Sequence, residues 1–354
     1  MKRRTRLKAE VGALLCVALL WAVNFKTDCL PRAPAGTLRH VVKVAPNCEK
    51  SSGKATQQED PDAHYNLGLM NSNGDGVSKD NKEAAKWFIK AAEQGHVRAQ
   101  YSLGMMYGRG DGVSKDYKEA AEWLTRAAEQ GDTAAQYALG WMYDKGEGVA
   151  QDYKEAARWY TKAAEQGNAD AQCALGLMYY EGEGVAQDYK EAAKWFMKAA
   201  EQGDTAAQCI LGVMYDQGQG IAQDYKEAAK WYMKAAEHGN AHAQYILGVM
   251  YAKGQGVAQD QKEAAKWYTN AAKQGKASAQ LELAVMYLEG TGVLEDYVEA
   301  YKWAILTMNG TDADAQRAGA HLRDLLRKYL TPSQIEEAQR RAKDLLGERG
   351  HSPT

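Results

Sequence analysis

Ser51 and Lys54 have the S-x-x-K spacing of serine acylases, in which a lysine helps a serine to attack a carbonyl carbon. They lie in a stretch of Pro, Ser, Gly, Lys and Gln residues that shows no sustained hydrophobic period. No supporting motif accompanies them in the sequence. We therefore attribute this spacing to chance rather than to an acyl-transfer site.

Glycine-rich loops and a pair of histidines are the other patterns with chemical potential. The motif Gly-x-Gly followed by Val or Ile recurs seven times, but no Lys-Ser/Thr follows it as in a phosphate-binding loop, so we interpret it as a structural turn. His238 and His242 are four residues apart, yet Gly239 and Asn240 predict a helix boundary between them, which disfavours a shared metal ion. We predict no catalytic residue, no metal site and no cofactor.

The recurrence of these loops reflects an internal repeat. Seven tryptophans are spaced by 36 residues without insertion or deletion: Trp87, Trp123, Trp159, Trp195, Trp231, Trp267 and Trp303. All six prolines lie outside residues 62 to 331, which favours continuous helices over a loop-rich β fold. The 34 glycines therefore punctuate a repeat and do not indicate a disordered chain.

Each copy of the repeat predicts two helices joined by the glycine loop. In the second copy, Ala99, Leu103 and Met106 share one apolar face of a first helix, helix A. Asp116, followed three residues later by Glu119, is an acidic capping pair that opens a second helix, helix B. Between copies, a Gly followed by Asp or Asn predicts a tight turn from one helix to the next. Two such short helices cannot bury their apolar faces alone, so consecutive copies must stack.

A glycine inside helix A, Gly104 in the second copy, recurs in six copies and becomes Ala284 in the seventh. An interior glycine costs about 1 kcal/mol relative to alanine. Its repetition predicts close packing of the tryptophan, or of helix B, against helix A. We interpret the repeated tryptophans as core residues rather than as ligand-binding residues.

The run A-x-x-x-L-G-x-M-Y, then G-x-G-V, D-Y-K-E-A, W and A-A-x-x-G, resembles the Sel-one-like repeat (SLR), a branch of the tetratricopeptide-like (TPR-like) superfamily, over residues 62 to about 310. The resemblance implies an all-α fold. The expected architecture is an α/α solenoid, a right-handed superhelix of seven 36-residue helix-turn-helix repeats with C-terminal capping helices. Departures from the pattern, such as Asn71 and Tyr301, lie in the terminal copies, where a solenoid must change its outer face.

The N-terminus predicts export. A basic cluster from Lys2 to Lys8 precedes the apolar run Val11 to Val23, which is shorter than the ~20 residues of a spanning helix. A cleaved signal peptide and an inner-membrane signal-anchor both fit, because small residues suited to cleavage, Ala33 and Ala35, lie well beyond Val23. Both predict a location in the periplasm or cell envelope.

These signals divide the chain into five segments. They are residues 1–25, a signal peptide or signal-anchor; 26–60, a disordered linker; 61–310, seven repeats; 311–348, C-terminal capping helices; and 349–354, a disordered tail.

Cysteine use allows one disulfide. Cys29 and Cys48 can pair across the linker in an oxidising compartment, and two free thiols are the alternative. The resemblance adds a comparison, because some SLR proteins are cysteine-rich, carry a disulfide in each repeat and bind or hydrolyse β-lactams. Here Cys173 and Cys209 occupy equivalent sites of adjacent copies, expected ~9–10 Å apart, too far for a bridge. That subfamily's disulfide is absent.

Charge restricts the class of partner. The 44 basic and 46 acidic side chains nearly balance, which excludes a nucleic-acid-binding protein held by a broad basic face. Contact with a membrane is expected only through the N-terminal segment.

Variation among the copies indicates a binding face. Three helix-A positions spaced i, i+4 and i+8 differ from copy to copy, and in TPR-like solenoids helix A lines the concave surface. We predict that these residues bind a peptide or protein, the alternative being size-tolerant core positions. The candidates are Tyr101, Met105, Arg109, Tyr137, Trp141, Lys145, Leu177, Glu181, Val213 and Tyr245.

The sequence thus favours a non-catalytic adaptor of the bacterial cell envelope that holds a protein or peptide partner. Two alternatives remain open: an envelope enzyme acting on β-lactams or peptidoglycan, and a secreted effector directed at a host.

Overall fold

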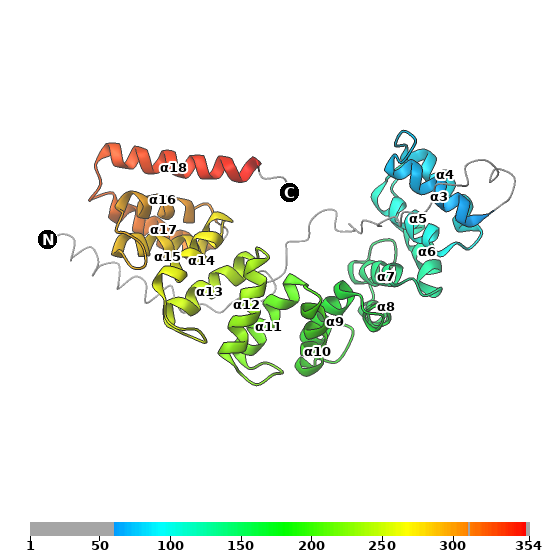
Figure 1. Cartoon of the computed structure of the whole chain (residues 1–354), viewed down its shortest axis with the longest axis horizontal. Helices are drawn as coiled ribbons and strands as arrows, with labels where there is room; N and C mark the ends of the chain where they lie inside the picture. The colour runs from blue at the N-terminus through cyan, green and yellow to red at the C-terminus, as the bar shows by residue number, and fades with distance from the viewer. Residues whose placement is uncertain (1–59, 311, 352–354) are drawn as a thin grey trace. The chain divides into compact units, whose positions relative to one another are not determined.

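The computed structural model describes residues 60–310 and 312–351, and all regular structure within these residues is α-helical (Figure 1). The predictions for residues 1–25 and 26–60, for the Cys29–Cys48 pair and for Ser51 and Lys54 lie outside the described residues. The helices are α3 (Pro61–Asn73), α4 (Asn81–Glu93), α5 (Val97–Arg109), α6 (Tyr117–Glu129), α7 (Thr133–Lys145), α8 (Tyr153–Glu165), α9 (Ala169–Glu181), α10 (Tyr189–Glu201), α11 (Thr205–Gln217), α12 (Tyr225–Glu237), α13 (Ala241–Lys253), α14 (Gln261–Lys273), α15 (Ala277–Glu289), α16 (Tyr297–Thr307), α17 (Ala313–Leu326) and α18 (Pro332–His351).

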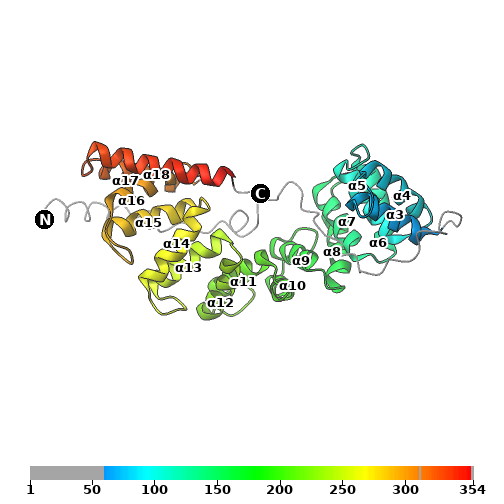
Figure 2. The same cartoon turned by 45° about the horizontal axis from the view of Figure 1, so that its top comes forward.

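The described helices belong to two compact units. One contains α3 to α10 and ends at Asp204, and the other contains α11 to α18 and begins at Thr205. Within each unit, consecutive helices pack against one another, from α3 to α10 in the first and from α11 to α17 in the second (Figures 1 and 2). Helix A of each copy is odd-numbered, α3 to α15, and helix B is even-numbered, α4 to α16. The prediction of an all-α solenoid of helix-turn-helix repeats is confirmed.

The helix ends follow the predicted capping chemistry. Before α8, an Asp152 carboxylate oxygen accepts hydrogen bonds from the amides of Lys154 at 2.9 Å and Glu155 at 3.1 Å. The Glu155 side chain pairs with Arg158 at 3.3 Å. The amide of Asp152 donates to the carbonyl of Tyr143 in helix A at 3.0 Å. The cap thus joins the two helices of one repeat as well as starting the second.

The glycine inside helix A provides room for a side chain of helix B. A Cβ added to Gly140 would lie 2.7 Å from Cδ1 of Tyr160, and one added to Gly176 would lie 2.8 Å from Cδ1 of Phe196. The packing partner is therefore the residue after the tryptophan, and of the two predicted partners helix B is correct and the tryptophan is not. In the seventh copy Ala284 faces helix B where the equivalent residue is Ala304, which leaves space for the extra methyl group.

The repeated tryptophans link neighbouring repeats. Trp123 and Trp159 each pack against a hydrophobic cluster that includes helix-B alanines of the preceding copy. Trp159, Trp231 and Trp303 are buried, whereas the other four are half-buried. A lysine one turn later covers part of the ring, with Lys162 Nζ 4.0 Å from the centroid of Trp159. The core interpretation is thus correct for three tryptophans and too simple for the four at the boundary with solvent.

A buried glutamine also couples adjacent repeats. Gln136 of α7 donates from Nε2 to the carbonyl of Ala128 in α6 at 3.1 Å. Its Oε1 accepts from Gln166 Nε2, at the end of α8, at 2.7 Å. Gln100, Gln172 and Gln244 make the same pair of hydrogen bonds in their own copies. These side chains satisfy polar groups at the repeat boundary that burial would otherwise leave without partners.

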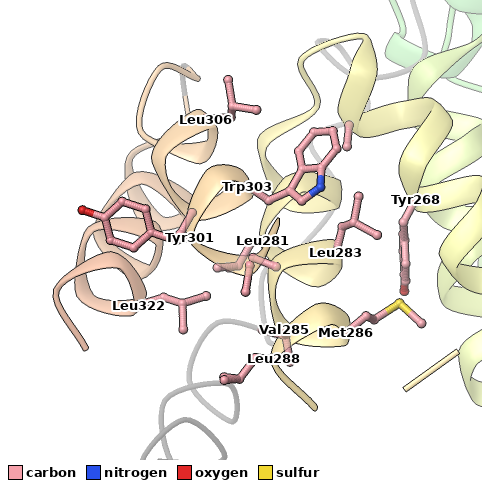
Figure 3. Close-up of a cluster of buried hydrophobic side chains, with 14 of the residues drawn as sticks. Tyr268, Leu281, Leu283, Val285, Met286, Leu288, Tyr301, Trp303, Leu306 and Leu322 are labelled. Atoms are coloured by element: carbon pink, nitrogen blue, oxygen red, sulfur yellow. The ribbon is translucent and has the colours of Figure 1, made fainter. Parts of the chain in front are cut away.

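The last two helices cover the end of the second unit. α17 packs on α15 and α16, and α18 packs on α16. Ala338 and Ala342 of α18 join a hydrophobic cluster with Tyr301 and Trp303 of α16, part of which is drawn in Figure 3. The backbone of α18 continues to His351, past the predicted end at residue 348.

Candidate partner-binding face

The candidate residues lie on the helix-A members of both units. In the first unit, α5 carries Tyr101, Met105 and Arg109, α7 carries Tyr137, Trp141 and Lys145, and α9 carries Leu177 and Glu181. In the second unit, α11 carries Val213 and α13 carries Tyr245. We refer to the eight residues of α5, α7 and α9, with Cys173, as the helix-A face of the first unit.

Burial divides the candidates into accessible and inaccessible groups. Arg109 and Lys145 are exposed, and Tyr101, Tyr137, Trp141, Leu177, Glu181 and Tyr245 are half-buried. Met105 and Val213 have exposed fractions of only 7% and 2%. These two side chains therefore offer a partner almost no surface, and Met105 packs in a cluster with Leu139 and Trp159.

The tyrosines of helix A rest on the aromatic rings of helix B. The ring of Tyr137 lies 5.7 Å from that of Tyr160, and the ring of Tyr245 lies 5.9 Å from that of Tyr268. Tyr160 and Tyr268 are the rings that pack over Gly140 and Gly248. Because the core fixes these rings, the tyrosines above them form a rigid floor for any bound segment.

Acidic side chains lie near Tyr137 of α7. Burial raises the pKa of the Tyr137 hydroxyl, and the nearby Asp170, Cys173, Asp204 and Asp144 raise it further. Burial also raises the pKa of the Cys173 thiol, as does the neighbouring Asp204 carboxylate. Cys173 is thus a buried free thiol held in its protonated form, which is unsuited to nucleophilic attack.

The second unit has a half-buried acid, Glu282, on α15. Burial raises the pKa of Glu282 to about 7, with Lys253 opposing the shift and Glu289 adding to it. Burial likewise raises the pKa of Asp216 on α11, and Lys253 opposes that shift too. Sequence reasoning missed Asp170 and Glu282. Both occupy positions that hold alanine in other copies, at Ala134 and Ala138, which is the signal that could have revealed them.

Other candidate chemistry is limited among the residues that the structure describes. These residues contain no group of three or more His, Cys, Asp or Glu side chains arranged to hold a metal ion. A cavity of about 230 Å³ between α14, α16 and α18 is lined partly by Lys302 and Arg341. Both cations pair with Glu299, and Arg341 also pairs with Glu337, with its Nε 2.8 Å from Glu337 Oε1, so each cation already has a carboxylate partner. The arrangement of the face supports non-covalent recognition.

A stack of paired helices with variable side chains along helix A defines the class of helical-repeat binding proteins. The Sel1 repeat family profile matches residues 61–96, 97–132, 133–168, 169–204, 205–240, 241–276 and 277–306. The chain therefore belongs to the Sel1 repeat family, which confirms the resemblance seen in the sequence.

Three solved structures share at least 31% sequence identity with this chain over the parts that align. A Sel1 repeat protein from Oxalobacter formigenes is 38% identical, with 75% of this chain and 76% of that chain covered and a TM-score of 0.63. The protein c5321, a protective antigen of uropathogenic Escherichia coli with an SLR fold, is 32% identical, with 82% and 77% covered and a TM-score of 0.39. Cysteine-rich protein B of Helicobacter pylori is 31% identical, with 39% and 99% covered and a TM-score of 0.31.

The remaining comparisons bear on function only indirectly. A search of curated proteins found no match. Sel1 repeat proteins are generally non-catalytic scaffolds for protein interaction, and bacterial members are often exported. Among the described helices, none combines the length and apolar character needed to cross a bilayer.

Proposed function

We propose that this protein is a non-catalytic scaffold of the bacterial cell envelope that binds a peptide or protein on the helix-A face. The proposal rests on a difference in solvent exposure between invariant and variable positions of the same helix. Leu103, Leu139 and Leu175 are identical between copies and at most 1% exposed. At a position that differs between copies, Trp141 of α7 and Leu177 of α9 keep part of their surface in solvent, whereas the equivalent Met105 and Val213 are buried.

This contrast is what a binding surface requires. Buried repeat positions are constrained because every copy must pack against the next one. Partly exposed positions on the same helices are freer to vary, and large apolar side chains there gain free energy when a partner covers them. Trp141 and Leu177 lie on adjacent members of the helix-A series, with the exposed Lys145 at the end of α7.

The envelope location rests on the N-terminal sequence. The basic cluster and apolar run of residues 1–25 support export as either a cleaved or an anchored protein. Fusion of residues 1–60 to alkaline phosphatase, which is active only outside the cytoplasm, should give an active reporter. Loss of reporter activity on replacing Leu14 and Leu15 with arginine would tie export to the apolar run.

Site-specific photo-crosslinking of the full chain tests the binding face. We expect benzoylphenylalanine at Leu177 to form partner adducts, because this half-buried side chain lies on the helix-A face. The same group at Lys154, exposed on helix B, is the control. Trp141→Ala should reduce the Leu177 adducts at least fivefold and lower the Tm by only a few degrees.

Two results would contradict this proposal. One is an equal yield of the same adducts at Leu177 and Lys154, which would indicate contact without a defined face. The other is turnover of a chromogenic β-lactam or of muropeptides by the purified chain, which would favour the enzymatic alternative.

A further inference from the structure

The helix-A face of the first unit has an uneven charge distribution. Around Tyr65 and Tyr101, near α5, lie the cations Arg98 and Arg109 and the carboxylate of Asp132. Near α7 and α9, four carboxylates accompany one lysine, which gives a net charge of −3. The acidic residues are Asp144, Asp170, Glu181 and Asp204, and the lysine is Lys145. We refer to these five residues as the acidic end of the face.

The lysine of the acidic end pairs with only one of its four carboxylates. Lys145 Nζ pairs with Asp144 Oδ2 at 2.7 Å, so its charge is taken up by the adjacent residue. Asp204 interacts with the Cys173 thiol. Asp170 is exposed at the second residue of α9 and forms no ion pair with another described residue. Its charge is available to a partner.

These carboxylates surround a half-buried aromatic and aliphatic floor. Asp144, Asp170 and Asp204 all lie close enough to Tyr137 to raise the pKa of its hydroxyl. Trp141 and Leu177 extend the same surface along the helices and keep part of their area in solvent. A surface of this composition attracts a guanidinium or ammonium group by charge and by cation–π contact, and it covers neighbouring apolar side chains. An anionic segment would be repelled.

From this geometry we infer that the partner segment bound over α7 and α9 is cationic, with arginine or lysine next to apolar residues. This inference rests on the proposed function, because it specifies the chemistry recognised by the same face. The basic group lies beside Asp170, and its apolar neighbours cover Trp141 and Leu177.

A matched set of peptides tests the inference with the full chain. The probe is acetyl-Ala-Leu-Arg-Leu-Arg-Ala-amide, and its counterparts carry citrulline or glutamate in place of both arginines. In fluorescence anisotropy or calorimetry we expect the arginine peptide to bind about tenfold more tightly than the citrulline peptide, and the glutamate peptide to bind least. Raising the salt concentration from about 50 to 500 mM should weaken only the arginine peptide.

Variants of the protein locate the interaction. Asp170→Asn combined with Glu181→Gln should weaken the arginine peptide about tenfold. Glu165→Gln, which removes one exposed carboxylate at the end of α8, should change its affinity less than twofold. Asp170→Lys combined with Glu181→Lys should make the glutamate peptide the preferred ligand, a gain that unfolding cannot imitate. Thermal melts confirm that each variant is folded.

The inference and the proposed function can fail separately. Equal affinity for all three peptides, binding of none of them, or equal effects of the face and control variants would overturn the cationic partner. If Leu177 adducts still form and mass spectrometry maps them to an acidic or neutral segment, the scaffold function stands and this inference falls. Absence of Leu177-specific adducts would overturn both.

Discussion

At the scale of single residues, Glu282 shows how one substitution in a repeated position changes the chemistry of a face. The preceding copies hold Ile210 and Ile246 at this position, and Glu282 is half-buried there. Burial raises its pKa to about 7, above the 4.5 of an ordinary glutamate. The charged carboxylate is therefore disfavoured in the folded protein relative to the unfolded chain.

This shift makes stability depend on pH in a defined direction. Between pH 4.5 and about 7 the folded state binds the proton of Glu282 more tightly than the unfolded state, so unfolding becomes easier as pH rises. Glu282→Gln stays neutral and should be more stable than wild type above pH 7, by about 1–3 kcal/mol, and equal to it near pH 4.5. Urea unfolding at pH 4.5, 6 and 8.5 measures the difference.

Glu237→Gln, at an exposed carboxylate of α12, is the matched control and should follow the wild-type pH curve. Parallel curves for wild type and Glu282→Gln would contradict the assigned environment of Glu282.

At the scale of elements, the loop between helix A and helix B fixes each repeat against the one before it. Gly148 has a φ of 75°, and a Cβ there would lie 2.0 Å from the carbonyl oxygen of Tyr117 at the start of α6. Gly167, at the turn between α8 and α9, has a φ of 93° but no atom within 4 Å of an added Cβ. Both positions favour glycine, but only Gly148 touches the preceding repeat.

Alanine substitutions separate these two requirements. Gly167→Ala should cost about 1 kcal/mol of unfolding free energy, because only the left-handed backbone is strained. Gly148→Ala should cost about 2 kcal/mol or more, because the loop must also move away from α6. Guanidinium unfolding of the two variants tests this order, and equal losses would show that the loop contact contributes nothing.

At the scale of the whole molecule, the α11–α18 unit ends differently from its internal repeats. α18 supplies Ala338 and Ala342 to the cluster around Tyr301 and Trp303, and Arg341 pairs with Glu299 of α16. An internal repeat would cover this surface with its own helices. Here a helix of another sequence does so, as a terminal cap of a repeat array must.

Removal of residues 331–354 should therefore lower the Tm of the full chain by at least about 5 °C and promote association, because apolar surface on α16 becomes exposed. Removal of residues 347–354 alone should leave the Tm within about 2 °C, because Ala338, Ala342 and Leu345, which pack in or against the cluster, are retained. Calorimetry and light scattering of the two truncations make the comparison. An unchanged Tm after the longer deletion would contradict a capping role for α18.

The sequence predicted those features of the candidate face that are local, but not those that depend on contacts between repeats. Its placement on helix A was expected from the i, i+4, i+8 spacing. The spacing did not reveal that Met105 and Val213 are buried while Trp141 and Leu177 stay partly exposed, because this depends on how the next repeat stacks. Of the acidic end, Asp144, Asp170 and Asp204 were not predicted for a similar reason. These carboxylates come from several elements that only folding brings together.

The sequence by itself determined the 36-residue period, the helix ends and the all-α repeat class. These features are local, because Asp152 caps its own helix and Gly131 ends the one that precedes Asp132. Only the tertiary structure decided which ring covers the helix-A glycine, how Gln136 bonds across the repeat boundary and why the pKa of Glu282 is raised. Each of these depends on contacts between segments that lie apart in sequence, and stacking of the helices brings those segments together.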